Sequence, residues 1–347
     1  MLMRKFGGAI NVGVYYGATK NQVDNTFSLG IRGAIPGTRC YCLVDGVIID
    51  YEDADIYGRF LKKWSFLAYP NKTKEFYFPS GTDFTDILPL GNPNLSDWDF
   101  TLAPSLSYLN SRYIACQLYD FSNCNMVYIE NYDQGVICNM ILGHLHPDLW
   151  KIRSRGNKMI MPSSDEHNNY APNLTHIDVG NAQQINPGIG NMQNMVELTD
   201  LRLTGNTENQ SLDTFTKLTT LILISCSFTL TNIANLPLLG AFGGEYIYIN
   251  GGNCSVDYSS STVLWQISQR RTTNYLLPEH VPPNLTWYDS SQNENMKGER
   301  IGQLWIKLDA LGKTNGYHRY STAAIIPPEY DAVRASLVAK GWNIFAG

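Results

Sequence analysis

The chain has 347 residues, of which 44% are hydrophobic and 12% aromatic, so it is long enough for one large domain or two to three ordinary ones. Its net charge of −5 argues against a sequence-independent nucleic-acid binder, which needs a basic face. Charged residues make up only 16%, against about 25% in a typical soluble domain, and Tyr is abundant at 21 residues. This composition is typical of β-rich extracellular or virion proteins rather than of soluble metabolic enzymes. No segment reaches the roughly 18 apolar residues of a membrane helix, so we expect no membrane insertion.

The first 150 residues consist of short aromatic and β-branched runs separated by turn signals. Alternating apolar residues from position 10 to position 16 predict a first strand. Asp45-Gly46, between the apolar runs 40–44 and 47–49, predicts a β-hairpin. Residues 57–67 are expected to hold one short helix. We therefore predict that this half is mostly antiparallel β-sheet.

Residues 162–172 are rich in Ser, Asn and His and predict a loop or a domain boundary. After it, Leu198-x-x-Leu201-x-Leu203-x-x-Asn206 and Leu218-x-x-Leu221-x-Leu223-x-x-Cys226 repeat one frame, and looser copies start at Leu174, Leu236 and Leu285. The frame and its spacing of roughly 20 residues are typical of leucine-rich repeats. In such repeats the inward leucines of one coil stack on those of the next. We therefore predict one buried ladder on adjacent parallel strands, formed by Leu201, Leu203, Leu221 and Leu223. The alternative is a plain α/β domain whose strands lie about 20 residues apart.

The last 47 residues predict two helices joined through a tight turn and a strand. One face of residues 301–311 carries Leu304, Ile306, Leu308 and Leu311, and Gly312 follows at the usual place of a helix C-terminal glycine. Asn315-Gly316 predicts the turn, and residues 329–340 predict the second helix. We expect Trp342 to be buried against the first helix and the last repeat near Leu285 and Tyr288. Such a unit would cap the open end of a solenoid.

The motif Leu308-Asp309-x-x-Gly312-x-x-Asn315-Gly316, followed by Lys340-Gly341-Trp342-x-Ile344, resembles a C-terminal cassette of known proteins. Those are the leucine-rich-repeat and tail-fibre-like proteins of Bacteroidota phages and their hosts. The resemblance covers residues 301–344 closely and residues 174–293 loosely, and it does not cover residues 1–150. It implies a solenoid fold and a place in a phage virion.

Two pairs of metal-binding residue types alternate along predicted strands. His144 and His146 could place two imidazoles on one side of a strand, although no third ligand lies at a diagnostic spacing. Cys40 and Cys42 alternate in the same way, and a metal or redox role is the alternative to simple burial. The seven cysteines are odd in number and irregularly spaced, so we expect most of them to be reduced and buried.

Two groups of carboxylates could carry chemistry. Asp45, Asp50, Glu52, Asp53 and Asp55 could collect Ca²⁺, but they do not form the usual calcium loop, and a solvated turn is the preferred interpretation. Asp83, Asp86, Asp97 and Asp99 could include the carboxylate pair of a sugar-degrading tailspike. The sequence assigns no catalytic, cofactor or metal residue, and we expect neither an enzyme nor a cofactor.

The sequence as a whole predicts a mixed α/β chain with three parts. Residues 1–160 form a β-rich domain for attachment or oligomerisation, residues 161–300 an irregular leucine-rich-repeat solenoid, and residues 301–347 a helical cap. We expect a non-enzymatic phage structural protein, in a fibre, tail or head-decoration position, that assembles in the bacterial host cytoplasm as a homo-oligomer, with a trimer favoured. Its expected partners are other virion proteins and a host surface glycan or protein. The alternative is a bacterial leucine-rich surface adhesin or interaction module.

Overall fold

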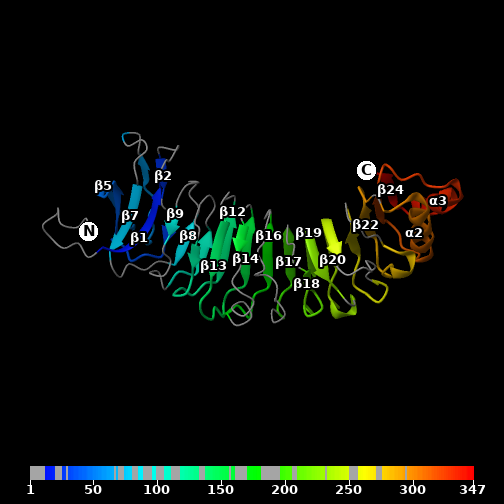
Figure 1. The fold of residues 1–347 in the computed structure, drawn as a ribbon, viewed down its shortest axis with the longest axis horizontal. Helices are drawn as coiled ribbons and strands as arrows, with labels where there is room; N and C mark the ends of the chain where they lie inside the picture. Colours follow the sequence, from blue (N-terminus) through cyan, green and yellow to red (C-terminus); the bar gives the residue numbers. More distant parts are fainter. Residues whose placement is uncertain are drawn as a thin grey trace. The chain divides into compact units, whose positions relative to one another are not determined.

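A computed structural model of the chain describes residues 12–19, 26–28, 30–65, 68, 74–79, 85–88, 96–98, 105–110, 118–132, 137–155, 158–160, 170–180, 196–204, 209–230, 233–249, 257–270, 276–293 and 295–347. They belong to two compact units. Unit 1 comprises Met1–Leu174 and Val179–Ala182, and unit 2 comprises Thr175–Asp178 and Gln183–Gly347. Over these residues the chain is mixed α/β with many strands and few helices (Figure 1). None of the helices so described is long and apolar enough to cross a membrane.

Unit 1 begins with an antiparallel five-stranded sheet in the order β5-β4-β7-β1-β9. Its strands are β1 (Val12–Thr19), β4 (Arg39–Val44), β5 (Val47–Asp53), β7 (Lys74–Pro79) and β9 (Ser96–Trp98). The predicted first strand is confirmed. The predicted hairpin is also confirmed, because Asp45 and Gly46 join β4 to β5 with φ values of 47° and 76°, which a type I′ turn requires.

The short helix predicted for residues 57–67 is wrong. The carboxylate of Asp55 accepts hydrogen bonds from the backbone N–H groups of Tyr57 and Arg59, at 2.8 and 2.9 Å, and so closes a turn. Gly58 follows with a φ of 68°. The chain then enters β6 (Lys63–Ser65), which pairs antiparallel with β2 (Thr26–Ser28). The local hydrogen bonds of the aspartate compete with helix formation at this point.

From β8 onward, the described strands of unit 1 other than β9 pair in parallel with one another. β3 (Gly30–Arg32) pairs antiparallel with β8 (Asp86–Leu88), and β8, β10 (Tyr108–Asn110), β12 (Tyr128–Tyr132) and β14 (Lys151–Arg155) then pair in parallel. A second parallel set is β11 (Leu118–Asp120), β13 (Ile137–Ile141) and β15 (Lys158–Ile160). The antiparallel prediction is therefore wrong for this part. Connections of about 20 residues are long enough for parallel neighbours, which a hairpin cannot join.

Unit 2 is built on a parallel sheet in the order β17-β19-β20-β21-β22-β23-β24. These strands are β17 (Asp200–Thr204), β19 (Thr220–Thr229), β20 (Ala241–Ile249), β21 (Gln266–Ser268), β22 (Trp287–Ser290), β23 (Tyr317–Tyr320) and β24 (Asn343–Ala346). β18 (Asn209–Ser211) pairs with the end of β19, and β16 (His176–Gly180) lies where the two units divide. Apart from β18, the described strands of unit 2 thus follow chain order in the sheet.

The predicted leucine ladder is confirmed. Leu201 pairs in register with Leu221, and Leu203 with Leu223, on the parallel strands β17 and β19. All four side chains are at most 1% exposed. The same inward position continues through Ile267, Tyr288, His318 and Ile344 in the later strands. Unit 1 carries an equivalent buried row at Leu109, Ile129 and Ile152.

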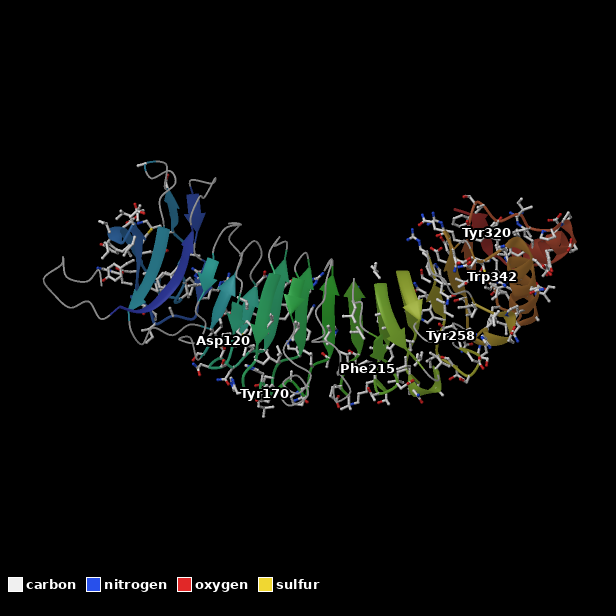
Figure 2. The ribbon with its side chains drawn as sticks, in the orientation of Figure 1. Asp120, Tyr170, Phe215, Tyr258, Tyr320 and Trp342 are labelled. Carbon is white, nitrogen blue, oxygen red and sulfur yellow. The ribbon has the colours of Figure 1, made fainter. Side chains whose placement is uncertain are left out.

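Short turns with a period of three residues return the chain from one strand to the next. The N–H of Phe215 bonds to the carbonyl of Leu212 at 3.2 Å, and the N–H of Leu218 to that of Phe215 at 2.9 Å. Leu239 and Leu236 repeat this bond at 3.1 Å in the next coil. Each of these side chains is buried, so every third residue supplies the core. Figure 2 shows Phe215 and Tyr258 on this turn side of their coils.

Threonines tie neighbouring coils together just before β17 and β19. The carbonyl of Thr199 accepts hydrogen bonds from the N–H groups of Thr219 and Thr220, at 2.9 and 3.1 Å. It also accepts one from the hydroxyl of Thr219 at 2.9 Å, and Thr199 makes the same hydroxyl bond to Thr175 at 3.1 Å. A small hydroxyl residue at this position therefore adds a second hydrogen bond between coils.

One repeat was predicted in the wrong register. The sequence frame that starts at Leu236 aligns Leu236 with Leu218. The structure pairs Phe242 with Leu221, so Leu239 is the equivalent of Leu218. Leu236 belongs to the preceding turn, where a leucine at a spacing of three looks identical in the sequence. The long gap after this repeat holds a further strand, β21, whose buried residues Leu264 and Ile267 follow the same spacing.

Two helices follow the parallel strands in unit 2. α2 (Gly298–Ala310) buries Ile301, Leu304, Trp305 and Leu308 on one helical face. Leu304 and Leu308 were predicted there, whereas Leu311 is the half-buried C-cap residue of the helix. The prediction that Ile306 lies on this buried face is wrong, since its side chain is 54% exposed. With 3.6 residues per turn, position 306 points away from the face formed by residues 301, 304, 305 and 308. α3 (Asp331–Ala339) confirms the second helix, and short 3₁₀ segments occupy η4 (Ile233–Asn235), η5 (Pro278–His280) and η6 (Pro328–Tyr330).

The predicted burial of Trp342 is confirmed, since its side chain is 3% exposed. Its indole Nε1 donates a 2.8 Å hydrogen bond to the carbonyl of Lys313. A Cβ atom on Gly316 would lie 2.4 Å from the indole ring, so only glycine fits beneath it. Gly312 has a positive φ of 66°, as predicted for a glycine at the end of the first helix, and Gly341 has a φ of 83° after the second helix. Figure 2 shows Trp342 and Tyr320 beside α2.

Candidate ligand-binding face

Aromatic side chains occupy matching outward positions on the last strands of unit 2. Trp287, on β22, pairs in register with Tyr317, on β23, directly before the buried residues Tyr288 and His318. The centroids of the two rings are 5.2 Å apart and their planes differ by 6°. At that separation two nearly parallel rings overlap face to face, because rings lying edge to edge would be farther apart. Phe345, on β24, meets Tyr317 edge-on at 5.3 Å.

Polar and charged side chains occupy the next outward position of the same strands. Asp289 pairs in register with Arg319, and Ser268 precedes Asp289 in the same row. Asp289 is 4% exposed, accepts the N–H of Ser291 at 2.9 Å, and lies 4.0 Å from the guanidinium of Arg270. The Nε of Arg319 is buried and has no hydrogen-bond partner within the described part of the chain.

We call this surface the Trp287 face and define it by one set of side chains: Gln266, Trp287, Asp289, Tyr317, Arg319 and Phe345. Trp287 stacks on Tyr317 with one of its ring faces, and its other face is directed along the sheet towards Gln266, its register neighbour on β21. An aromatic face carries partial negative charge and attracts weakly positive C–H groups. The carboxamide, carboxylate and guanidinium groups beside it can donate and accept hydrogen bonds. The arrangement suits a ligand with both C–H faces and hydroxyl groups.

The structure brings His144 and His146 together, with ring centroids 4.4 Å apart. The side chain of His146 is fully buried and already paired. Its Nδ1 accepts the N–H of Met126 at 3.1 Å, and its Nε2 is 3.1 Å from the carbonyl of Leu142. Burial lowers the pKa of His146, so it is held neutral. This histidine occupies a core position in a three-residue turn, and nowhere among the described residues do three His, Cys, Asp or Glu side chains gather as a metal site would require.

The acidic group from Asp45 to Asp55 is occupied by cations of the protein itself. Arg39 makes a bidentate pair with Asp53, with Nε and Nη2 at 2.6 and 2.8 Å from its oxygens. The hydrogen bond to Arg39 lowers the pKa of Asp53, and that to Arg59 lowers the pKa of Asp55. Lys62 pairs with Asp50 at 2.6 Å. Glu52 accepts the N–H groups of Leu61 and Lys62.

Cys40, Cys42 and Cys124 are buried free thiols. Burial raises the pKa of Cys42 to about 12 and that of Cys40 well above its ordinary value, which disfavours the reactive thiolate. Of the four aspartates considered for sugar cleavage, Asp83 and Asp99 lie outside the described residues. Asp86 is on β8 and accepts the hydroxyl of Thr85 at 2.6 Å, and Asp97 is on β9 in the antiparallel sheet. Those two residues therefore stand on strands of different sheets.

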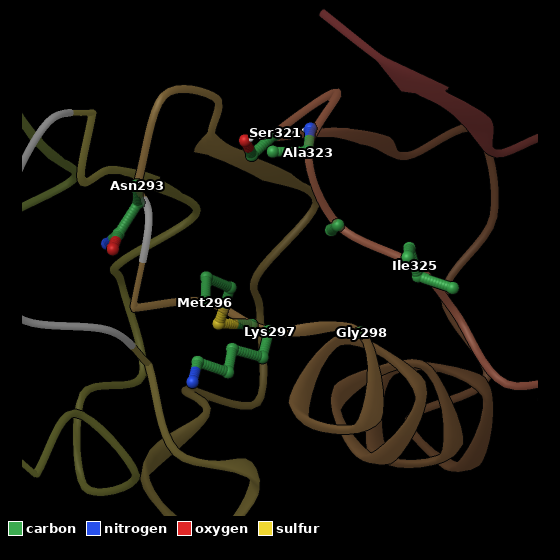
Figure 3. A pocket seen from close by; sticks show the side chains of 8 residues that line it. Asn293, Met296, Lys297, Gly298, Ser321, Ala323 and Ile325 are labelled. Atoms are coloured by element: carbon green, nitrogen blue, oxygen red, sulfur yellow. Dashed lines mark hydrogen bonds between the residues drawn. The ribbon is translucent and has the colours of Figure 1, made fainter.

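A hollow of about 440 Å³ lies beside the first turn of α2 (Figure 3). Its wall contains Asn293, Met296, Lys297, Gly298, Ser321, Ala323, Ala324 and Ile325. Lys297 is the one charged residue in this lining, so the hollow holds no pair of acid and base. Gly298 permits the carbonyl of Ile325 to approach the helix, since a Cβ there would lie 1.7 Å from that oxygen.

Comparison with known proteins gives a weak likeness. No protein-family profile matches the chain, and no curated protein matches it. Among solved structures, the chain is similar to the functional domain of InlJ from Listeria monocytogenes, which includes a cysteine ladder, at 13% identity and a TM-score of 0.29. The alignment covers 65% of this chain and 57% of that one, so the chain spans little more than half of the InlJ domain.

Proposed function

We propose that the chain is a non-enzymatic recognition protein that binds a surface carbohydrate through the Trp287 face. The observation that carries the proposal is the stack of Trp287 on Tyr317 beside Asp289 and Arg319. Aromatic side chains provide rigid contact area at low entropic cost, and the flanking polar groups fix orientation. A pyranose ring offers C–H groups to the indole and hydroxyl groups to the carboxylate and guanidinium.

The carboxylate content of this face supports binding rather than cleavage. Sugar hydrolysis normally uses two carboxyl groups on either side of the scissile bond. Asp289 is the one carboxylate of the Trp287 face, and it is committed to the N–H of Ser291. A rigid single carboxylate of this kind positions a hydroxyl group.

The solenoid and the phage setting are parts of the same proposal. Strands in chain order, the leucine ladder and the three-residue turns support a solenoid of leucine-rich-repeat type. The resemblance of residues 301–344 to the cassette of Bacteroidota phage and host proteins supports a virion component. Residues 1–160 would attach the chain to the particle or join it into a trimer. Mass spectrometry of purified particles, and light scattering of the isolated chain, test these two points.

The binding proposal is tested on an array of neutral and carboxylated glycans. The wild type should bind a subset of them, and Trp287→Ala should weaken that binding strongly while leaving the fold intact. Val338→Ala is the matched control, because Val338 is 53% exposed on α3 and is not part of the face. Loss of the stack should cost about 0.5–1.5 kcal/mol of stability, which thermal unfolding would show. A wild-type chain that binds no glycan on the array would contradict the proposal.

A further inference from the structure

Unit 1 carries a second outward face with the same register as the Trp287 face. Tyr108, on β10, and Tyr128, on β12, pair in register directly before the buried residues Leu109 and Ile129. Their ring centroids are 4.6 Å apart and their planes differ by 5°, so they too overlap face to face. Two strands of unit 1 therefore repeat the aromatic stack that marks the candidate site of unit 2.

The second outward position of these strands repeats the pairing of carboxylate and arginine. Glu130 pairs in register with Arg153, as Asp289 does with Arg319. Glu130 is 5% exposed and accepts the Tyr128 hydroxyl at 2.5 Å, the Asn110 amide at 3.2 Å and the Arg153 guanidinium at 3.3 Å. This network holds Tyr128 in one orientation and leaves Glu130 neutralised by Arg153.

The two ends of this row carry opposite charges. Asp86, the register neighbour of Tyr108 on β8, is negative, and the end of the row at β14 is positive. Lys151, the register neighbour of Tyr128 on β14, has its ammonium 5.6 Å from the ring centroids of both Tyr128 and Trp150. Trp150 is 41% exposed, and its ring lies 5.6 Å from that of Tyr128. The Oδ1 of Asn110 is buried and accepts no hydrogen bond from any group that the structure describes. A ligand can therefore meet an exposed indole and a cation at one place.

We infer that this surface, formed by Tyr108, Trp150 and Lys151 over the buried ring of Tyr128, is a second carbohydrate site and that its ligand carries a carboxylate. The inference rests on the proposed function, because it gives that recognition role a second, independent site. A sugar ring would lie against the exposed indole of Trp150 and the outer part of the tyrosine stack. Its carboxylate would pair with the ammonium of Lys151. Opposite charges on the ligand and the surface favour acidic over neutral sugars.

The test uses an array of neutral and carboxylated glycans with four chains: wild type, Trp287→Ala, Lys151→Gln and the double variant. Lys151 is a surface residue, so its replacement leaves the fold intact, and Lys217→Gln is the control for the loss of one positive charge. Lys217 lies in unit 2, where it pairs with Glu197 at the surface. In the Trp287→Ala background, binding of carboxylated glycans should persist and should fall about tenfold on addition of Lys151→Gln. Calorimetry of the strongest carboxylated ligand should give two sites per wild-type chain and one per Trp287→Ala chain.

The outcomes separate the inference from the proposed function. Binding that vanishes completely with Trp287→Ala would overturn the second site and leave the first. Binding in the Trp287→Ala background that is equal for neutral and carboxylated sugars, or unchanged by Lys151→Gln, would overturn the acidic ligand. A wild-type chain that binds no glycan would remove the proposed function, and this inference with it.

Discussion

The indole Nε1 of Trp305 donates a 2.8 Å hydrogen bond to Nδ1 of His318, and both side chains are completely buried. The bond fixes Nδ1 as the acceptor, so the proton of the neutral ring is on Nε2. His318 stands in the inward row between Tyr288 and Ile344, where the other strands of unit 2 carry leucine, isoleucine or an aromatic residue. A polar ring in this row joins α2 to the sheet by a directed bond.

The burial of His318 should make stability depend on pH. Burial lowers the pKa of His318 to about 3, below its ordinary value of 6.5. Above pH 6.5 the ring is neutral in both the folded and the unfolded chain, so its titration does not change the free energy of unfolding. Below it the unfolded chain binds a proton that the folded chain does not, so stability falls until about pH 3. Between pH 6.5 and 5, urea unfolding of the wild type should lose about 2 kcal/mol more than that of His318→Gln. Equal losses in the two proteins would show that His318 does not titrate this way.

Removing the acceptor should expose the cost of an unpaired indole N–H. His318→Leu places an apolar side chain at this buried position and leaves Trp305 Nε1 without a hydrogen-bond acceptor. The substitution should lower the free energy of unfolding by about 1–3 kcal/mol. His318→Gln restores an acceptor and should cost less. If chemical denaturation ranks the two variants the other way round, packing rather than the hydrogen bond decides the stability of this row.

The leucine ladder gives a test with a matched control in the same unit. Leu221 is fully buried between Leu201 and Phe242, and Leu221→Ala should cost about 2–5 kcal/mol because it leaves a cavity. Leu238 is 51% exposed, and Leu238→Ala should change the stability by less than about 0.5 kcal/mol. Equal unfolding midpoints for the two variants would contradict a ladder that is packed from coil to coil.

The contact between Gly316 and Trp342 predicts a coupled pair. Gly316→Ala places a Cβ in the space of the indole, so it should destabilise the chain clearly. Trp342→Ala should cost about 3–5 kcal/mol and leave glycan binding by the folded fraction unchanged. In the Trp342→Ala background, Gly316→Ala should cost much less, because the ring that it strikes is gone. Additive costs in the double mutant would show that the two residues do not act on each other.

The sequence predicted those parts of the fold that depend on residue type at fixed spacing. Leu201 and Leu221 were placed correctly and the burial of Trp342 was predicted, because a leucine frame and a glycine-bounded helix each have one dominant solution. The parallel strands of unit 1 were missed, although Leu106-x-x-Leu109, Met126-x-x-Ile129 and Leu149-x-x-Ile152 follow the frame of the later repeats. Isoleucine or methionine replaces leucine at several of these positions, and none of the three segments has the third leucine of the frame. The pattern was therefore not identified as a repeat.

The two aromatic faces could not be found from the sequence. Trp287 and Tyr317 are separated by α2 and its flanking turns, and only the register of β22 on β23 brings them together. The abundance of tyrosine was visible, but abundance does not distinguish sheet packing from a surface for ligands. The sequence also could not show which groups surround the histidine pair and the carboxylates, because Met126 at His146 and Arg39 at Asp53 are distant from them in the sequence.

The most direct test of the central claim is the affinity of Trp287→Ala for the strongest glycan ligand whose binding Lys151→Gln leaves unchanged. This affinity is measured by calorimetry beside that of Val338→Ala. An aromatic residue at the centre of a binding face typically contributes about 2 kcal/mol or more, which is a loss of at least about 30-fold. The account predicts this loss for Trp287→Ala and an unchanged affinity for Val338→Ala. An affinity of folded Trp287→Ala within about twofold of the wild type would contradict it.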